Sequence, residues 1–343
     1  MLPSLSAREE RHVVRPKRTV HGSQLLDIIG RMDLVSIEEI RDAASRVEGV
    51  AVRTPLLEQA WAPLWLKPES LQPIGAFKVR GAYNAIAALD EDQRARGVVA
   101  FSSGNHAQAV AYSAKRFGIP AVILIPDVAP RAKVEATKAL GAEVIEVPID
   151  AQESSALAVA DERRLTMIPP FDHRDVIAGQ GTVGLEITED LPDAGVVLVP
   201  LSGGGLASGV GTAIKALLPG AKVVGVEPEL AGDTAEGLRA GRRIEWPMDL
   251  RARTSADGLR AQPSDLTFAH LQAVLDDVIT VSEEEIREAV RTLAHRARLV
   301  AEPSGATATA AFLSHRDALP PGKVVSVVSG GNLDPATLAD LLA

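Results

Sequence analysis

The chain has 343 residues, a formal net charge of −9 and no cysteine. Its length favours two domains, and its hydrophobic and charged fractions, 46% and 24%, are those of an ordinary globular protein. The acidic balance argues against nucleic-acid and anionic-membrane partners, which need a basic patch, and 3% aromatic residues leave little to stack on bases. The lack of cysteine excludes disulfides, thiolate nucleophiles and cysteine-based metal sites, so a cytoplasmic location is expected.

Residues 1–31 carry several arginines, and their only apolar cluster is too short for the core of a signal peptide. We therefore predict a flexible tail. The folded body is expected to begin after Met32 with a helix, because Ser36 can cap its start and Glu39, three residues later, can complete a capping box. No apolar run approaches the length of about eighteen residues that predicts a membrane span.

The next part of the chain alternates between strand-like and helix-like patterns. Short strands are predicted at 53–59 and 64–70, and a helix follows from Lys78 to about Leu89. From Gly97 the alternation becomes regular, with strands at 98–103, 120–126 and 142–148 and helices at 104–118 and 129–141. Strands and helices at this spacing predict βαβ units around a parallel sheet, and hence an α/β fold.

The same alternation returns in the second half of the chain. We predict helices at 181–191, 206–218 and 281–299, and strands, two of them followed by glycine turns, at 195–205, 221–229 and 323–332. The last of these helices has a capping box of Ser282 with Glu285. Between 231 and 265 the periodicity is lost, so no regular element is predicted there.

Lys78 is the first candidate for chemistry. It lies between Phe77 and Val79, after the chain breakers Pro73 and Gly75, where a loop is expected to become a helix. Burial at that point would lower the pKa of the ammonium group and leave an amine that can attack a carbonyl, as Schiff-base lysines do. The alternative is a solvated surface lysine at the start of a helix.

A glycine loop follows one of the predicted buried strands. Ser202 and Gly203–Gly205 open the next helix, and three consecutive glycines let an anion approach the unpaired N–H groups of a helix N-terminus. The pattern matches neither a Walker loop nor a dinucleotide fingerprint, so it favours a single phosphate. A tight strand-to-helix turn without a ligand is the alternative.

A second turn of this kind follows the strand at 98–103. It offers N–H groups, two hydroxyls, an amide and an imidazole to a small carboxylate, from Ser102, Ser103, Gly104, Asn105 and His106. Alternatively, one serine only caps the helix and His106 is a surface residue.

A third turn, Ser329–Asn332, lies near the C-terminus. Ligands of open α/β sheets bind beyond the carboxyl ends of the strands, so the three turns are expected to converge there. A phosphate site, a carboxylate site and the amine of Lys78 together meet the needs of pyridoxal phosphate with an amino acid.

Five segments resemble one family in their order and separation. They are KPESLQPIGAFKVRGA at 67–82, SSGNHAQ at 102–108, VIAGQGT at 176–182, SGGGL at 202–206 and VSGGN at 328–332. Together they resemble the fold-type II pyridoxal-phosphate enzymes, in particular the serine/threonine dehydratases and serine racemases. The resemblance implies a fold like that of the tryptophan synthase β subunit, with two open, twisted, mostly parallel sheets, helices on both faces and the cofactor between two domains.

The implied large domain binds the cofactor and contains residues 32–96 and 176–343, and the implied small domain, residues 97–175, carries the substrate loop. A small-molecule amino-acid substrate and a homodimer are expected from the family. Few residues follow the last motif, so a regulatory domain and feedback inhibition by isoleucine are not expected.

The resemblance also implies roles for individual residues. Lys78 would form the aldimine with the cofactor and, once released, move the α-proton of the substrate. Asn105 would bind the 3-oxygen of the cofactor, and Ser329 would face its ring nitrogen; a neutral hydroxyl there makes a weaker electron sink and favours prompt loss of a β-hydroxyl group. The implied cofactor contacts are Lys78, Phe77, Asn105, Ser202, Gly203, Gly204, Gly205, Leu206 and Ser329, and the implied substrate contacts are Ser102, Ser103, Gly104, Asn105 and His106.

A divalent cation is implied by the acidic loop at 225–233. Glu227, the carbonyl of Ala231 and Asp233 match the cation loop of the racemase and dehydratase group, and hard oxygen ligands suit Mg²⁺ or Ca²⁺. Without the resemblance, these residues would form an ordinary acidic loop.

The main hypothesis for activity is a dehydratase (ammonia-lyase) of β-hydroxy amino acids such as L-serine or L-threonine, which gives a 2-oxo acid and ammonia. One alternative is a serine racemase in which Lys78 and Ser103 act as acid and base on opposite faces of the substrate. Others are a dehydratase of hydroxyaspartate or phenylserine, and a regulatory protein that binds pyridoxal phosphate without catalysis. Ala76 stands where the family usually has serine, which leaves the choice of substrate open.

Overall fold

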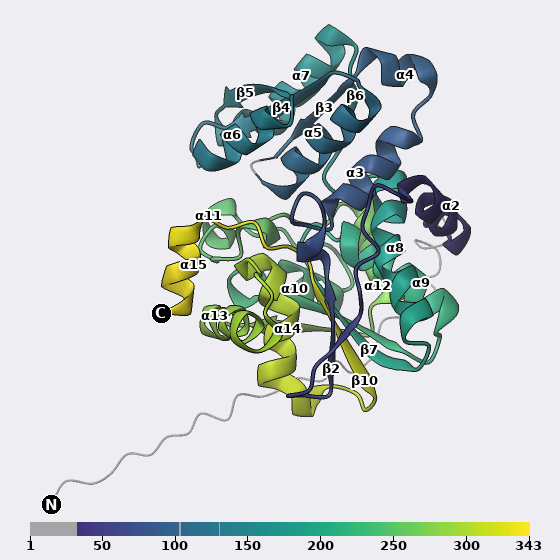
Figure 1. Ribbon diagram of the computed structural model, residues 1–343, viewed down its shortest axis with the longest axis vertical. Helices are drawn as coiled ribbons and strands as arrows, with labels where there is room; N and C mark the ends of the chain where they lie inside the picture. The colour runs from purple at the N-terminus through teal and green to yellow at the C-terminus, as the bar shows by residue number, and fades with distance from the viewer. Residues whose placement is uncertain (1–32, 103, 130) are drawn as a thin grey trace, which may run out of the picture.

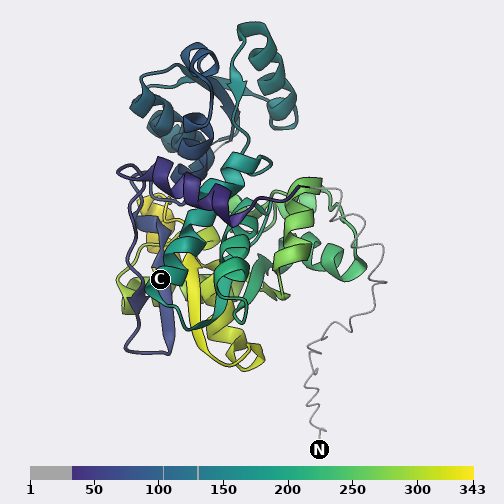
Figure 2. The same cartoon turned by 90° about the vertical axis from the view of Figure 1, so that its right-hand side faces the viewer.

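The computed structural model describes residues 33–343 with the exception of 103 and 130. Within this range the chain forms two open sheets with their helices, one above the other in Figure 1. The smaller sheet lies at the top and the larger sheet below it. In the turned view of Figure 2, helix α2 (Ile37–Val47) runs across the junction of the two bodies. The predicted tail at 1–31 lies outside the described residues.

Six strands form the larger sheet, in the order β1-β2-β10-β7-β8-β9. Every neighbouring pair is parallel except β1 and β2, which make an antiparallel edge. The strands are β1 (Leu57–Glu58), β2 (Leu64–Pro68), β7 (Ala194–Pro200), β8 (Lys222–Pro228), β9 (Asp277–Val281) and β10 (Lys323–Val328).

Four parallel strands form the smaller sheet, in the order β5-β4-β3-β6. They are β3 (Val98–Phe101), β4 (Ala121–Pro126), β5 (Glu143–Val147) and β6 (Thr166–Met167). The sequence predicted three of them, but not the two-residue strand β6, which is too short to show a periodicity.

Helices cover both faces of the larger sheet because its strands are apolar on both sides. In β7, Val196 and Leu198 pack into one core, and Val197 and Val199 pack into the other. Successive side chains of a strand point to opposite faces, so a continuous apolar run is what a sheet buried between two helix layers requires. The predicted fold class, α/β with two open, mostly parallel sheets, is confirmed.

Apart from α8, the helices that the sequence predicted begin close to the predicted positions. The capping boxes of Ser36 with Glu39 and of Ser282 with Glu285 are both present. Among the described residues, no helix combines the length and apolarity that crossing a membrane would take. The other helices are α3 (Lys78–Ala87), α4 (Glu91–Arg96), α5 (Asn105–Phe117), α6 (Arg131–Ala139), α7 (Gln152–Arg163), α8 (Arg174–Asp190), α9 (Gly205–Leu217), α10 (Asp233–Ala240), α11 (Met248–Arg251), α12 (Asp265–Val274), α13 (Glu283–Thr292), α14 (Pro303–His315) and α15 (Pro335–Leu342).

Several features differ from the prediction, which also omitted helices α4, α7 and α15 and strand β9. Helix α8 begins at Arg174 rather than near 181, because Gly179 and Gly181 allow close packing instead of breaking the helix: a Cβ at Gly179 would lie 2.6 Å from the carbonyl oxygen of Arg80. Helices α10 and α11 lie within the segment 231–265, which showed no period, and α12 begins at its end. Helix α14 was missed because nearly all of its residues are buried, so it has no polar face to give a helical repeat.

A buried cluster of charges anchors the start of helix α3. The guanidinium of Arg80 lies 2.7 Å from a carboxylate oxygen of Glu69 and 2.6 Å from one of Glu186, and Lys67 pairs with Glu186 at 2.6 Å. Burial alone would raise the pKa of Glu69, but the charge and hydrogen bond of Arg80, with smaller contributions from Lys67 and Thr54, together lower it. The cluster therefore ties α3 to strand β2 and to helix α8, two residues after Lys78.

Replacing Arg80 by Met should destabilise the fold by about 3 kcal/mol, because removal of one partner leaves buried carboxylates without their counter-charge. We expect the midpoint of thermal unfolding, followed by circular dichroism, to fall by several degrees. Arg163→Met is the matched control, since Arg163 pairs with Glu143 at 2.8 Å on the surface and should leave the midpoint unchanged. Equal midpoints for the two variants would contradict the account of the cluster.

Candidate active site

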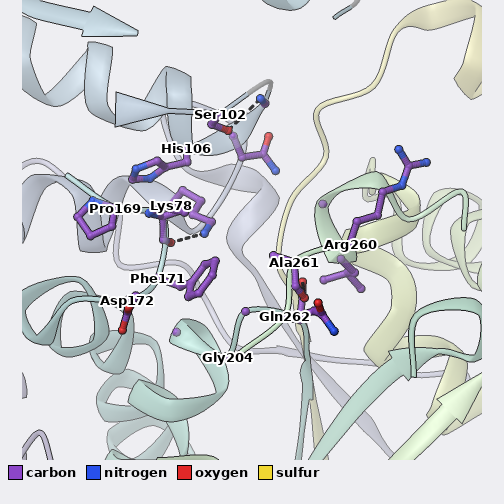
Figure 3. A pocket seen from close by; sticks show the side chains of 18 of the residues that line it. Lys78, Ser102, His106, Pro169, Phe171, Asp172, Gly204, Arg260, Ala261 and Gln262 are labelled. Carbon is purple, nitrogen blue, oxygen red and sulfur yellow. Dashed lines mark hydrogen bonds between the residues drawn. The ribbon is translucent and has the colours of Figure 1, made fainter. Parts of the chain in front are cut away.

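A cavity of about 670 Å³ opens between the two bodies (Figure 3). Its lining comes from the first residues of α3 and α5, the loop between β7 and α9, and the turn after β10. The three predicted turns contribute Ser102, Gly204 and Ser329 to one space, together with Lys78. The carboxyl ends of strands from two different sheets thus face the same cavity.

Lys78 is the first residue of helix α3 and is half-buried against the cavity. Its Nζ donates a hydrogen bond of 2.6 Å to the carbonyl oxygen of Pro170. Burial lowers the pKa of Lys78 to about 8, so a sizeable fraction of the amine is neutral near pH 7–8. In Figure 3 its side chain lies between His106 and Phe171.

The glycine loop joins β7 to helix α9 and forms the floor of the cavity beneath Phe171. A Cβ at Gly203 would lie 2.4 Å from the ring of Phe171, and Gly204 has a φ of +90°, so both positions require glycine. The first N–H groups of α9 have no partner within the helix and make an anion site. Ser202 donates to the carbonyl oxygen of Ala261 at 2.8 Å, and Leu206 also lines the cavity.

The loop after β3 supplies the opposite wall. Helix α5 begins at Asn105, and the N–H of Gly104 donates to the hydroxyl of Ser102 at 3.1 Å. Ser102, Gly104, Asn105 and His106 all line the cavity. Ser103, the predicted second acid/base, lies outside the described residues.

His106 is a buried, neutral imidazole, so the alternative of a surface residue is wrong. Its Nε2 lies 2.8 Å from the carbonyl oxygen of Ile168, which makes this nitrogen the donor. Burial, and next the charge of Lys78, lower the pKa of His106 to about 3. Nδ1 has no partner among the described residues and remains an acceptor.

The turn after β10 is hydrogen-bonded to the loop that precedes Lys78. The N–H of Phe77 donates to the carbonyl oxygen of Ser329 at 3.0 Å, and the N–H of Gly331 donates to that of Gly75 at 2.9 Å. Phe77 and Ser329 line the cavity, whereas Ala76 is buried against Gly330 and is not part of the lining.

The predicted cation loop lies outside the cavity lining. Glu227 at the end of β8 and Asp233 at the start of α10 are both buried, and one carboxylate oxygen of each has no partner among the described residues. Burial, and next Asp233, raise the pKa of Glu227 to about 8, and burial raises the pKa of Asp233 to about 6. No cluster of three or more His, Cys, Asp or Glu side chains occurs in the described part of the chain.

Several lining residues were not predicted from the sequence. Glu302 accepts a hydrogen bond from the side chain of Asn105, which lies 197 positions earlier in the chain. Lys133 of the smaller body forms an ion pair of 2.6 Å with Asp257 of the larger body. Phe171 packs on the glycine loop. Only Glu302 had a local signal, because Pro303 after it marks a helix start.

Comparisons with known proteins agree with this arrangement. Residues 47–330 match the family model described as pyridoxal-phosphate dependent enzyme. The chain is 45% identical over 312 residues to the L-threonine ammonia-lyase of Thermotoga maritima, covering 88% of this chain and 76% of that protein. It is 39% identical over 316 residues to the L-threo-3-hydroxyaspartate ammonia-lyase of Saccharomyces cerevisiae, covering 89% and 95%. Maize serine racemase has a similar structure, with a TM-score of 0.86, 40% identity and coverage of 90% and 97%.

These matches span most of the chain and include the whole cavity lining up to Ser329. The expectation of an enzyme rather than a non-catalytic binding protein is confirmed. The chain belongs to the family of pyridoxal-phosphate dependent enzymes, in the fold-type II group that contains threonine ammonia-lyases and serine racemases.

Proposed function

We propose that this enzyme is an ammonia-lyase of β-hydroxy amino acids, which converts L-serine, L-threonine or a related compound into a 2-oxo acid and ammonia. The observation that carries the proposal is the meeting of three groups in one cavity: the half-buried amine of Lys78, the N–H groups of the glycine loop and those at the start of α5. Relatives named as ammonia-lyases support the same reaction.

The residues present fit pyridoxal phosphate. The cofactor requires a reactive amine and a phosphate site, and Lys78 and Gly203–Gly205 supply these in the same space. Bound there, pyridoxal phosphate withdraws electrons from the α-carbon of an attached amino acid. We assign the phosphate to the first N–H groups of α9, because a helix N-terminus is an anion site by its unpaired donors and its dipole.

Lys78 is proposed to bind the cofactor and to move the α-proton at Nζ. A pKa of about 8 suits both tasks, since a general base works best when its pKa lies near the working pH. The carbonyl of Pro170 holds the amine in place. His106 beside it stays neutral, so it adds no positive charge to the site.

The substrate carboxylate is assigned to the loop Ser102–His106, where the N-terminus of α5 faces the cavity. Ser329 is assigned to the ring nitrogen of the cofactor. A neutral hydroxyl there would leave that nitrogen without a buried negative partner and would make the bound group a weaker electron sink than a carboxylate partner would.

Racemisation is the second candidate, favoured by the similarity to maize serine racemase. It would need an acid/base on the face opposite Lys78, and Ser103 is the residue we propose for it. Hydroxyaspartate and phenylserine are further candidate substrates, and the similarity to the L-threo-3-hydroxyaspartate ammonia-lyase of Saccharomyces cerevisiae supports the first of them.

The reaction is tested by incubating the purified enzyme with each candidate amino acid in both enantiomers and measuring 2-oxo acid release. Chiral chromatography of the remaining amino acid gives the extent of inversion. We expect 2-oxo acid to be the main product, and Ser103→Ala to reduce inversion about 100-fold while elimination from the L-substrate persists. An excess of D-serine over pyruvate would instead favour the racemase, and absence of both products would contradict the proposal.

We also propose that Glu227, Asp233 and the carbonyl of Ala231 hold a divalent cation. The support is the pair of buried carboxylate oxygens without partners, since buried charges are normally paired or bound to metal. Oxygen ligands of this kind suit Mg²⁺ or Ca²⁺. These ligands are not part of the cavity lining, and we expect the cation to stabilise the fold around β8 and α10.

Addition of Mg²⁺ to chelator-treated enzyme should raise the midpoint of thermal unfolding, because the cation binds only the folded protein. Glu227→Gln should abolish the response. Glu229 is an exposed carboxylate in the same turn, and Glu229→Gln should respond like the unaltered enzyme. If neither Mg²⁺ nor Ca²⁺ changes the midpoint of thermal unfolding of the unaltered enzyme, the site is ruled out.

Each of the two sheets is proposed to belong to a separate domain with its own role. We propose that residues 97–175 form a small domain that carries the substrate loop, and that 32–96 with 176–343 form the large domain that binds the cofactor. Strands β3 to β6 lie in the first range, and the other strands lie in the second. The homodimer and the cytoplasmic location stay predictions from the family and the composition.

A further inference from the structure

A directional chain of hydrogen bonds runs through the side chain of Asn105. Nδ2 of Asn332 donates to the carbonyl oxygen of Ile74 at 2.7 Å and to Oδ1 of Asn105 at 2.8 Å. Nδ2 of Asn105 in turn donates to Oε1 of Glu302 at 2.6 Å. A backbone carbonyl can only accept, so Ile74 fixes the orientation of the first amide, and each amide fixes the next.

The chain leaves one donor of Asn105 for a ligand. A side-chain amide has two N–H donors and one oxygen, and Glu302 and Asn332 occupy one donor and the oxygen. The second hydrogen on Nδ2 has no partner among the described residues, and Asn105 lines the cavity. The amide is therefore arranged as a donor and not as an acceptor.

We propose that Glu302 is a positioning residue, whose carboxylate oxygen holds the amide of Asn105 so that its free N–H can serve the ring oxygen of pyridoxal phosphate. The inference rests on the proposed function and on the family resemblance, which implies that Asn105 binds that oxygen. Its new element is that the orientation of Asn105 depends on an acceptor, the carboxylate of Glu302, that lies 197 positions away in the chain.

The packing around Glu302 is built for this contact. The side chain is only 5% exposed, and a Cβ at Gly330 would lie 2.3 Å from its Oε1. The N–H of Glu302 also donates to the carbonyl oxygen of Gly330 at 3.1 Å. Without the carboxylate, the amide of Asn105 would lose its acceptor, and the torsion at its end has a broad, nearly two-fold profile that does not fix it alone.

Glu302 needs an acceptor oxygen, and not a negative charge, to hold the amide of Asn105. Burial raises the pKa of Glu302 to about 7, opposed by the hydrogen bond from Asn105, and the charge of Asp257 raises it further while that of Lys133 lowers it. An oxygen of the carboxyl group can accept in either protonation state. Glutamine has the same shape and a carbonyl oxygen, so it should replace Glu302, whereas alanine should not.

The test is the affinity of the apoprotein for pyridoxal phosphate, measured by absorbance titration. Glu302→Ala should weaken binding about tenfold, the equivalent of ~1.4 kcal/mol and of one hydrogen bond. Glu302→Gln should stay within about threefold of the unaltered protein. Equal affinity of Glu302→Ala and the unaltered protein would overturn the inference, as would a Glu302→Gln variant as weak as Glu302→Ala.

A double variant separates positioning from general packing. In an Asn105→Ala background, Glu302→Ala should cost nothing further, because the amide that it positions is gone; a full additional loss would overturn the inference. Asn332→Leu breaks the chain at its other link with Glu302 intact and should weaken binding to a similar degree. This variant keeps the test decisive if Glu302→Ala does not fold.

Thr309→Val is the control for damage to helix α14. Thr309 is buried on the same helix as Glu302, bonds to Ser326 at 2.9 Å and does not line the cavity. It should lower thermal stability and leave the cofactor affinity unchanged; a loss equal to that of Glu302→Ala would overturn the inference. Failure of the unaltered apoprotein to bind pyridoxal phosphate would contradict the proposed function itself, whereas binding that ignores Glu302 contradicts this inference alone.

Discussion

The guanidinium of Arg80, enclosed by the carboxylates of Glu69 and Glu186, is the interaction on which the site depends. It lies two residues after Lys78 on the first turn of α3 and joins that turn to β2 and α8. Such a cluster is costly to break and can be satisfied by one geometry only, so it fixes the backbone from which the lysine projects. The backbone position from which the reactive amine extends is therefore fixed.

Burial then sets the chemistry of the cavity. It lowers the pKa of Lys78 to about 8 and raises that of Glu302 to about 7, which leaves a base and an acid near neutrality in one space. The same burial keeps His106 neutral. The cavity thus holds two groups whose pKa values lie near physiological pH. The N-termini of α5 and α9 face it as well, beside the positive side chains of Lys133, Arg243, Arg251 and Arg260.

The sequence was sufficient where the determining contacts are local. Capping boxes such as Ser36 with Glu39 predicted where helices start, and apolar runs predicted strands. Glycine-containing turns predicted three of the segments that line the cavity. It was insufficient where contacts are distant: Glu302 meets Asn105 only through the fold, and Phe171 gives no local signal of its contact with the glycine loop. Buried elements such as α14 also escaped, because a helix covered on all sides has no amphipathic period.

Lys78 is the residue proposed to carry the cofactor. Reduction of the purified enzyme with borohydride, digestion and mass spectrometry would locate the pyridoxyl group on the chain. We predict that it resides on Lys78 and that Lys78→Ala carries none. Lys133 is a second lysine in the lining of the same cavity, so a pyridoxyl group found there, or retained in Lys78→Ala, would contradict this assignment.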